Sequence, residues 1–416
     1  MKNKKQSNLL KVCFAGGGTG GHIYPGLAVA DSLRSLCKKN GKEVKIFWIG
    51  NSSGMDRTIV SKNVDSDGNL SADVFYGIPS GKLRRYFSIR NFFDLFKIGF
   101  GFISSFFILL KIRPAVLFSK GGFVSVPPCI AAKLLHIPVF THECDFTPGL
   151  ATRLNSKSAE KILVTYEETK NYFSAAIQKK CVVTGNPVRP VFYKANPEEG
   201  RKFLGLGSSQ NDAAAEPAAE SNSGEVKTAS GGEKTNCSKP VLFVQGGSLG
   251  AHQINELVRE NIRWLCERFI VVHQTGSKEG DFFKSFEPEL QKSGDYKPYP
   301  FIYKEMCDVM ASSDVILSRA GANSIWESAV LSKPMVLIPL CGSGTRGDQE
   351  DNAANFEKQG AALVLSRENA TSEKLKSALT VLLEESQRAK MQEACRKLCS
   401  GKKSDEIISE MIYNRI

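Results

Sequence analysis

Residues 11–36 decide the fold, and they run KVCFAGGGTGGHIYPGLAVADSLRSL. A short apolar segment at 11–15 leads into a glycine cluster at 16–21. After Pro25 the apolar side chains recur at helical spacing up to Leu36. A strand, a glycine loop and a helix in this order are typical of the first unit of a parallel α/β domain.

The same alternation of elements continues along the chain. Further strands are predicted at 44–49, 115–118, 138–141, 161–164 and 181–184, with a helix at 128–135. The pattern then restarts with a strand at 241–244, a second glycine loop at 245–251 and a helix at 252–266. Strands at 269–274, 315–318 and 335–339, a helix at 324–331 and a helical stretch at 370–416 follow. The sequence therefore predicts an α/β fold of two Rossmann-like domains facing a central cleft.

Residues 207–239 interrupt this pattern. They contain one Val and no Leu, Ile, Phe, Tyr or Trp. Such a segment cannot bury enough apolar area to offset its conformational entropy, so we expect a disordered insertion there.

Composition narrows the class of protein. The net charge of +12 fits nucleic acid, an anionic membrane or a phosphorylated substrate as partner. No nucleic-acid-binding motif occurs in the sequence, which favours the membrane and the phosphate. The eleven Cys show neither paired nor metal-binding spacing, which is typical of reduced thiols in the cytoplasm. The apolar run at 12–15 is too short for the core of a signal peptide.

The first glycine loop admits several interpretations. Gly16, Gly18 and Gly21 satisfy the dinucleotide pattern GxGxxG, which also calls for an acidic residue after the second strand. That strand ends at Asn51 without one, which argues against NAD, and no G-K-[S/T] follows to make a P-loop. What remains is an anion cradle of backbone N–H groups at a helix N-terminus. His22 at this helix end is either structural or a neutral general base.

Two polar segments follow later strands. Ser324 and Glu327 have the spacing of a capping box, although the Glu327 carboxylate equally suits the two hydroxyls of a ribose. Residues 347–352, GDQEDN, follow the strand at 335–339 through a glycine-rich loop. They are either a solvated loop or a set of contacts to sugar hydroxyls.

The ordered motifs resemble those of the MurG family, the UDP-GlcNAc to lipid I transferases of peptidoglycan synthesis. The segments are GGGTGGHIYPGLAVA (16–30), KGGFVSVPPCIAAKLLHIP (120–138), THECD (141–145), GNPVR (185–189), QGGSLGAHQIN (245–255), SRAGANSIWE (318–327) and GDQEDNA (347–353). The resemblance implies the GT-B fold, with an acceptor domain at 1–188 and a UDP-GlcNAc domain at 189–400 that carries the insertion. It also implies that a final helix at 401–416 returns to the first domain.

The resemblance also implies roles for individual residues. We expect His22 to act as the catalytic base, with Glu143 and Asp145 as rivals. The expected acceptor contacts are Gly18, Thr19, His22, Phe123, His142 and Glu143. The expected donor contacts are Thr19, Gly20, Gly21, Asp145, Arg189, Ser248, Ala322, Asn323, Ser324, Glu327 and Gln349, with Asn352 supporting the sugar loop.

The chain departs from the family pattern at several positions. An HEQN motif that is common in the family is here His142-Glu143-Cys144-Asp145, and a common Tyr is Phe123. A double Gln in the sugar loop is Asp348-Gln349, and an RSGA motif is RAGA at 319–322. These departures affect the acceptor contacts more than the class of reaction.

The implied reaction is an inverting transfer of GlcNAc from UDP-GlcNAc to the C4 hydroxyl of lipid I, which gives lipid II. We expect no tightly bound cofactor or metal, and a divalent cation only as a stimulant. The alternatives are a diacylglycerol glycosyltransferase, a UDP-GlcNAc epimerase and a non-catalytic UDP-sugar sensor.

Residues 82–113 have the most unusual composition, with Phe side chains among Lys and Arg and a single acidic residue, Asp94. The uncharged run at 98–110 is too short to span a bilayer. The pattern predicts a helix with one face buried under the sheet and the other on anionic lipid, at the cytoplasmic face of the membrane.

Overall fold

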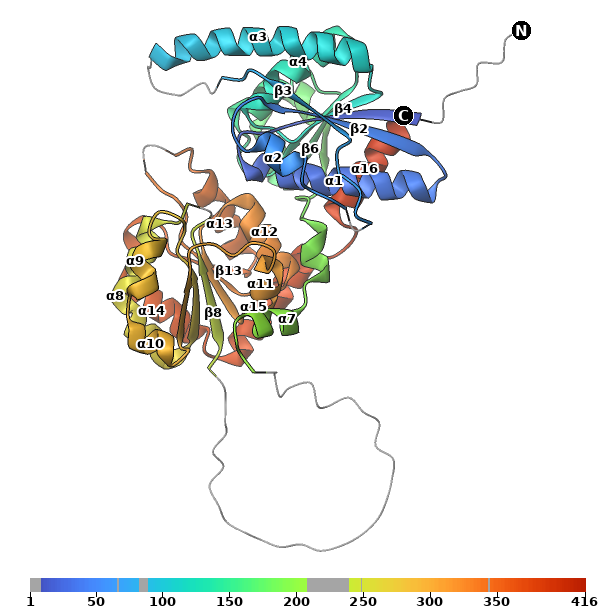
Figure 1. Cartoon of the computed structure of the whole chain (residues 1–416). Coiled ribbons are helices and arrows are strands. Elements are labelled where there is room, and N and C mark those ends of the chain that lie inside the picture. Colours follow the sequence, from blue (N-terminus) through green and yellow to red (C-terminus); the bar gives the residue numbers. More distant parts are fainter. Residues whose placement is uncertain (1–8, 66, 82–88, 208–238, 248, 343–344) are drawn as a thin grey trace, which may run out of the picture.

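The computed structural model describes residues 9–65, 67–81, 89–207, 239–247, 249–342 and 345–416, without the side chains of 89–91 and 93. These residues form two α/β lobes, one above the other in Figure 1. Almost all of the predicted insertion at 207–239 lies outside the described residues, and so do Ser248 and the basic residues at 82–88.

The N-terminal lobe contains a parallel sheet in the order β3-β2-β1-β4-β5-β6-β7. Its strands are β1 (Leu9–Ala15), β2 (Glu43–Asn51), β3 (Val74–Ile78), β4 (Val116–Ser119), β5 (Val139–Glu143), β6 (Lys161–Val164) and β7 (Cys181–Val183). Alternate residues of β1 face opposite sides of this sheet, since Val12 and Phe14 belong to one core cluster and Cys13 and Ala15 to another. Both faces are therefore buried, as in doubly wound folds.

The C-terminal lobe repeats the arrangement with a sheet in the order β10-β9-β8-β11-β12-β13. Its strands are β8 (Val241–Gln245), β9 (Ile270–Gln274), β10 (Tyr296–Tyr299), β11 (Val315–Ser318), β12 (Met335–Leu337) and β13 (Ala362–Val364). In both sheets the first strand of the lobe is central and is followed by a glycine loop. The predicted pair of Rossmann-like sheets is confirmed.

Helices cover both sheets. Those that begin in the N-terminal lobe are α1 (Gly20–Lys39), α2 (Asp56–Val60), α3 (Ile89–Ile112), α4 (Val126–Leu134), α5 (Leu150–Asn155) and α6 (Ala175–Gln178). The others are α7 (Pro197–Phe203), α8 (His252–Arg268), α9 (Gly280–Ser285), α10 (Pro288–Lys292), α11 (Met306–Ser312), α12 (Ala322–Val330), α13 (Asp348–Lys358), α14 (Ser372–Val381), α15 (Glu385–Leu398) and α16 (Ser404–Arg415).

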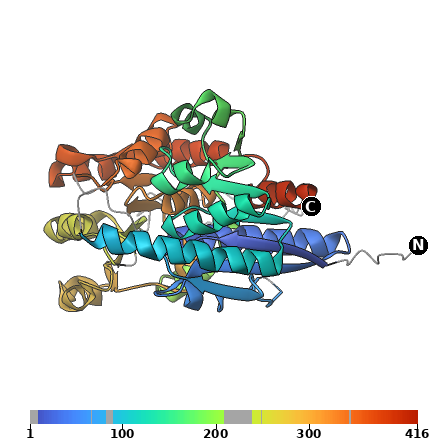
Figure 2. The same cartoon turned by 90° about the horizontal axis from the view of Figure 1, so that it is seen from above.

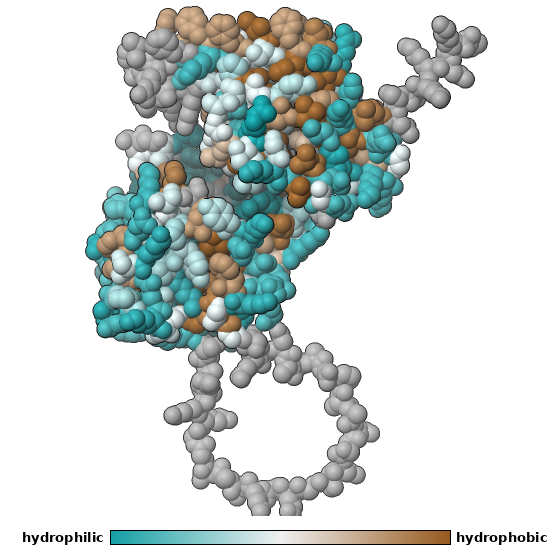
Figure 3. Space-filling model, viewed as in Figure 1, coloured by the Kyte–Doolittle hydropathy of each residue, from teal (hydrophilic) through white to brown (hydrophobic). Residues whose placement is uncertain are grey.

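Helix α3 lies on the outer side of the N-terminal lobe, away from the C-terminal lobe (Figures 1 and 2). It packs against α4, and Leu109 and Ile112 belong to the core beneath it. A band of hydrophobic residues follows this edge of the molecule (Figure 3). By length and composition alone, Asp94–Ile112 could cross a membrane, although the uncharged run at 98–110 within it is shorter than a spanning helix requires. The packing on α4, rather than length, indicates that α3 lies along the lobe.

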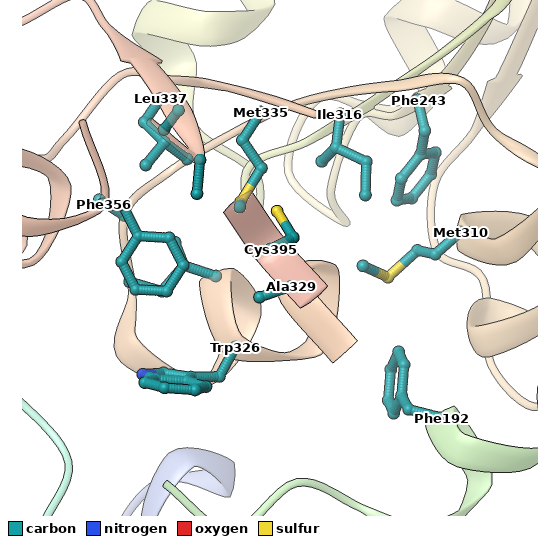
Figure 4. Packing of buried hydrophobic residues seen from close by; sticks show 14 of the residues in the cluster. Phe192, Phe243, Met310, Ile316, Trp326, Ala329, Met335, Leu337, Phe356 and Cys395 are labelled. Carbon is teal, nitrogen blue, oxygen red and sulfur yellow. The ribbon is translucent and has the colours of Figure 1, made fainter. Parts of the chain in front are cut away.

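The hydrophobic core of the C-terminal lobe also contains side chains from the N-terminal lobe and from the segment that connects the lobes. Trp326 of α12 packs against Phe356 of α13, and Phe192, which follows the last strand of the first sheet, belongs to the same cluster (Figure 4). The indole N–H of Trp326 donates to the hydroxyl of Tyr166 at 3.0 Å. Apolar and polar contacts thus connect the lobes below the cleft.

Helix α16 packs against α1, so the chain returns to the N-terminal lobe at its end (Figure 1). Ile408 and Ile412 are fully buried in the cluster that contains Val12 and Leu27. Arg415 also pairs with Glu160 at 2.8 Å. Burial of these two apolar side chains therefore holds α16, which follows the C-terminal lobe in the chain, on the N-terminal lobe.

Candidate active site

The first glycine loop is held by a carboxylate. The backbone N–H of Gly18 donates to both Asp56 oxygens, at 2.9 and 3.0 Å, and the N–H of Asn51 donates to the same carboxylate at 2.8 Å. A Cβ on Gly17 would lie 1.7 Å from this carboxylate, so only glycine fits there. Because Asp56 already occupies the amide of Gly18, the loop does not offer that amide to a substrate phosphate. This revises the expectation of a wholly open anion cradle and further weakens the NAD interpretation.

His22 lies in the first turn of α1, because the helix begins at Gly20 rather than at the predicted Pro25. Thr19 is the N-cap residue, yet its hydroxyl makes no cap hydrogen bond and instead lies 2.8 Å from His22 Nδ1. The imidazole stands against Gly122, where an added Cβ would lie 3.1 Å from His22 Cγ. When Nδ1 donates to Thr19, Nε2 is the ring nitrogen that carries a lone pair. Thr19 thus orients His22 and leaves the first-turn amides of α1 uncapped by a side chain.

Pro25 gives this helix a contact with the other lobe. A proline in a helix has no N–H for the carbonyl four residues earlier, here that of Gly21. The Asn323 side chain supplies the missing donor across the cleft, with Nδ2 at 3.0 Å from the Gly21 oxygen. Asn186 donates to Asn323 Oδ1 at 3.1 Å. Asn323, predicted in the nucleotide pocket, therefore joins the two lobes.

The second glycine loop opens onto a cavity of about 280 Å³. The lining includes Ser324 and Gln349 from the predicted donor set, together with Gly247, Gly250 and Arg319. Helix α8 begins beside this loop without a side-chain cap and without an acidic residue in its first turn. Its N-terminal amides therefore suit an anion. A cavity of about 280 Å³ is slightly smaller than the usual small-molecule site, so it has room for part of a ligand, such as a diphosphate, rather than for a whole nucleotide sugar.

Arg189 and Glu327, both predicted to bind donor, pair with each other. Arg189 Nε donates to Glu327 Oε1 at 2.9 Å, and its guanidinium lies over the rings of Tyr24 and Phe192. Burial raises the pKa of Glu327, and Arg189 opposes this shift. The Glu327 side chain is 15% exposed, and this salt bridge fixes it against Arg189.

Two local interpretations of the sequence were wrong. Helix α12 begins at Ala322 with Gly321 as its N-cap, so Ser324 lies inside the helix and the capping box with Glu327 does not form. Residues 348–352 are the first turns of α13 rather than a solvated loop, since Gly347 takes the left-handed φ of +76° that starts the helix. Gln349 Oε1 accepts from the backbone N–H of Leu340 at 2.9 Å.

The two acidic rivals of His22 are already engaged. Glu143 is 5% exposed and accepts the N–H groups of Asp145 and Gly149, at 3.1 and 2.9 Å. Asp145 accepts from Arg346 at 2.7 Å and from Asn352 at 3.1 Å. Burial and the nearby Glu143 raise the pKa of Asp145, while Arg346 lowers it. Each oxygen of the two carboxylates therefore already accepts a hydrogen bond, and the role of His22 as the base stays a prediction.

Among the described residues, Glu143, Cys144 and Asp145 bring possible metal ligands within 4.8 Å of one another. The two carboxylates have the partners given above, and burial raises the pKa of the Cys144 thiol to about 12. The hydrogen bonds that the two carboxylates already accept disfavour a metal ion at this place. The absence of a tightly bound metal stays a prediction.

His142 and Phe123 lie beneath the acceptor side. His142 is 1% exposed, its Nε2 lies 2.9 Å from the carbonyl oxygen of Gly185, and burial holds its pKa well below the usual range. In this structure His142 is thus held within the lobe, and its direct contact with acceptor stays a prediction. The half-buried ring of Phe123 packs on Gly18, where a Cβ would lie 2.5 Å from Cε1.

Sequence reasoning missed three residues of this region. Asp56 lies outside the glycine motif, Arg319 lines the donor cavity, and Arg346 joins the lobes. Of these three residues, only Arg319 lies inside one of the motifs that carry the family resemblance, so only Arg319 could have been predicted from the sequence. Asp56 and Arg346 reach the site through tertiary contacts.

Comparison with known proteins agrees with this architecture. Residues 12–164 match the glycosyltransferase family 28 N-terminal domain, and residues 241–411 match the family 28 C-terminal domain. The UDP-N-acetylglucosamine–N-acetylmuramyl-(pentapeptide) pyrophosphoryl-undecaprenol N-acetylglucosamine transferase of Treponema denticola is 51% identical over 85% of this chain and 83% of its own.

Solved structures show the same fold. Acinetobacter baumannii MurG has a TM-score of 0.68 at 22% identity, covering 97% of this chain and 99% of its own. The UDP-GlcNAc 2-epimerase of Neisseria meningitidis, bound to UDP-GlcNAc, has a TM-score of 0.61 at 15% identity, with 98% and 99% covered. The GT-B fold is confirmed, and the resemblance in sequence is confirmed with it. The chain belongs to the family of UDP-N-acetylglucosamine–N-acetylmuramyl-(pentapeptide) pyrophosphoryl-undecaprenol N-acetylglucosamine transferases, built from the two domains of glycosyltransferase family 28.

Proposed function

We propose that the chain transfers GlcNAc from UDP-GlcNAc to the C4 hydroxyl of lipid I, giving lipid II. The observation that carries the proposal is the 51% identity with a transferase of that name across most of both chains. Two features of the site support it. The N-terminus of α8, which has no side-chain cap, lies at the cavity beside Gly247 and Gly250, and His22 lies on the facing lobe.

His22 is the proposed base. Its Nδ1 is held by Thr19, and the competing acids each have both oxygens engaged. In the reaction, the acceptor oxygen forms a bond to the anomeric carbon as the bond from that carbon to the UDP oxygen breaks. The hydroxyl proton passes to His22 Nε2, and the electron pair of the broken bond leaves with UDP. Attack from the face opposite UDP inverts the anomeric centre.

The leaving group acquires negative charge, and the donor lobe carries groups that suit it. The N-terminal amides of α8 and the Arg319 guanidinium border the cavity. Preorganised donors of this kind stabilise developing charge more than water does. Glu327 binds the ribose hydroxyls through Oε2 while Oε1 stays on Arg189. Ser248, Ala322 and the amides of Gly20 and Gly21 keep their expected substrate roles as part of this proposal.

We also propose that α3 rests on the cytoplasmic face of the membrane. Phe92, Leu95, Phe96, Phe100, Ile103 and Phe107 are each at least 50% exposed. Their spacing places them along one side of the helix, and Lys97 and Lys111 lie on the same helix. An apolar stripe with adjacent basic residues suits an interface with anionic lipid. The polyprenyl tail of the acceptor then stays in the bilayer during transfer.

The experiment measures UDP release by the purified chain with UDP-GlcNAc and a lipid I analogue on vesicles. We expect release that depends on the acceptor. Release with diacylglycerol but not lipid I would favour the lipid glycosyltransferase. Conversion of donor alone to its epimer would favour the epimerase, and binding without release in any mixture would favour the sensor.

A further inference from the structure

An arginine of the donor lobe pairs with a carboxylate of the acceptor lobe. Arg346 precedes α13, and its Nη2 lies 2.7 Å from Asp145 Oδ2, just after β5. The same nitrogen lies 2.9 Å from Asp348 Oδ2, on the first residue of α13. The side chains of Arg346 and Asp145 are 30% and 16% exposed, so solvent screens the pair only in part.

Neighbouring hydrogen bonds follow the same path between the lobes. Asn352 donates to Asp145 Oδ1 at 3.1 Å and accepts the backbone N–H of Phe146 at 2.8 Å. The hydroxyl of Thr147 donates to Asp351 at 2.5 Å. Hydrogen bonds from Asp351 and Asn352 therefore fix the start of α13 to residues 145–147.

A close approach of backbone makes room for the arginine. A Cβ on Gly149 would lie 2.5 Å from Arg346 Nη1, so a larger residue there would displace the guanidinium. Gly149 is held in turn by the Glu143 carboxylate. The end of β5 and the residues after it thus bind the side chain of Arg346 from the other lobe.

The same turn of α13 carries Gln349, which the family resemblance implies is a donor contact in the sugar loop. We propose that Arg346 is a positioning residue that locks this turn to Asp145 and so closes the lobes over the GlcNAc of the donor. The inference rests on the proposed function for the identity of the sugar. UDP alone lacks that sugar, so its binding does not depend on the lock.

Calorimetry of Arg346→Met with UDP-GlcNAc and with UDP separates this role from a merely structural one. The coupling between neighbouring groups of one hydrogen-bond network is typically equivalent to about a tenfold change in affinity. We therefore expect UDP-GlcNAc affinity to fall about tenfold, while UDP affinity stays within about twofold of the native value. Arg346→Lys, which keeps the cation beside Asp145, should recover part of the loss. The matched control is Arg367→Met, whose ion pair with Glu350 at 2.7 Å stays within one lobe and should leave both affinities unchanged.

Equal losses for UDP and UDP-GlcNAc, or no loss for either, would overturn the lock. A double variant with Asp145→Asn adds a second test, because members of one lock should not have multiplying effects on UDP-GlcNAc affinity. Multiplied losses would mean independent roles. If the native chain binds UDP-GlcNAc but transfers nothing, the proposed function fails while the binding comparison still tests the lock.

Discussion

Replacing Phe96, Phe100 and Phe107 of α3 with Ser should release the chain from anionic vesicles. Each ring is at least 55% exposed and all three lie on one side of the helix. The folded state therefore loses little packing when they are removed, and the effect should fall on lipid binding rather than on stability.

The exposed fractions set the magnitude. A Phe side chain presents roughly 200 Å², so a ring about 60% exposed offers roughly 120 Å² to lipid, or about 3 kcal/mol at 25 cal/mol per Å². Three rings inserted to about half their depth contribute about 4.5 kcal/mol, which corresponds to a change in partition coefficient of roughly 2,000-fold.

The assay is sedimentation with phosphatidylglycerol vesicles, combined with thermal melting. The matched control is Phe282→Ser on α9 of the other lobe, where the ring is 53% exposed. We expect the control to bind vesicles like the native chain. Unchanged vesicle binding by a folded triple variant would refute the lipid-facing role. Unfolding of that variant would show that the three rings stabilise the fold, which would contradict the expectation of little lost packing.

His22→Ala should lower turnover by about 10²–10⁴-fold, the usual contribution of a general base, with donor affinity unchanged; near-normal turnover would exclude the base role. Glu327→Ala should weaken UDP-GlcNAc binding by about tenfold or more in calorimetry, because a charged hydrogen bond contributes about 1.5–3 kcal/mol; equal affinity would remove it from the ribose site. Burial raises the pKa of Asp405, at the α1–α16 contact, from 3.8 to about 6. The folded state then binds this proton more tightly than the unfolded chain does, so its contribution to stability is lost as pH rises from about 4 to about 6. In urea melts Asp405→Asn should match the native chain near pH 4 and exceed its stability by about 1–3 kcal/mol at pH 7; the reverse order would contradict the assignment.

Most of the fold could be predicted from local pattern. Strands buried on both faces appear as short apolar runs, and the two glycine loops mark where each sheet begins. Boundaries were less secure at helix starts, because Gly20 and Ala322 enter helices that glycine-rich sequence alone does not favour. In both cases contacts with the opposite lobe, through Gly21 and Asn323, accompany the early start.

The site was predicted as a set of residues but not as a set of partners. The sequence predicted Arg189 and Glu327 as individual donor contacts, and the structure shows that they pair with each other. It offered Glu143 and Asp145 as bases, and hydrogen bonds from residues near and far in sequence occupy both. Such pairings depend on the approach of the two lobes, which no local periodicity encodes.

The central claim is that a sugar passes from a uridine nucleotide to a lipid-bound alcohol held by the facing lobe. Radiolabelled UDP-GlcNAc incubated with a lipid I analogue on vesicles tests it most directly, by counting label in the lipid extract. We expect label to enter the lipid through a β-linkage and His22→Ala to slow its entry greatly. Label that stays entirely in water-soluble nucleotide sugar, with folded native protein and both substrates present, would contradict it.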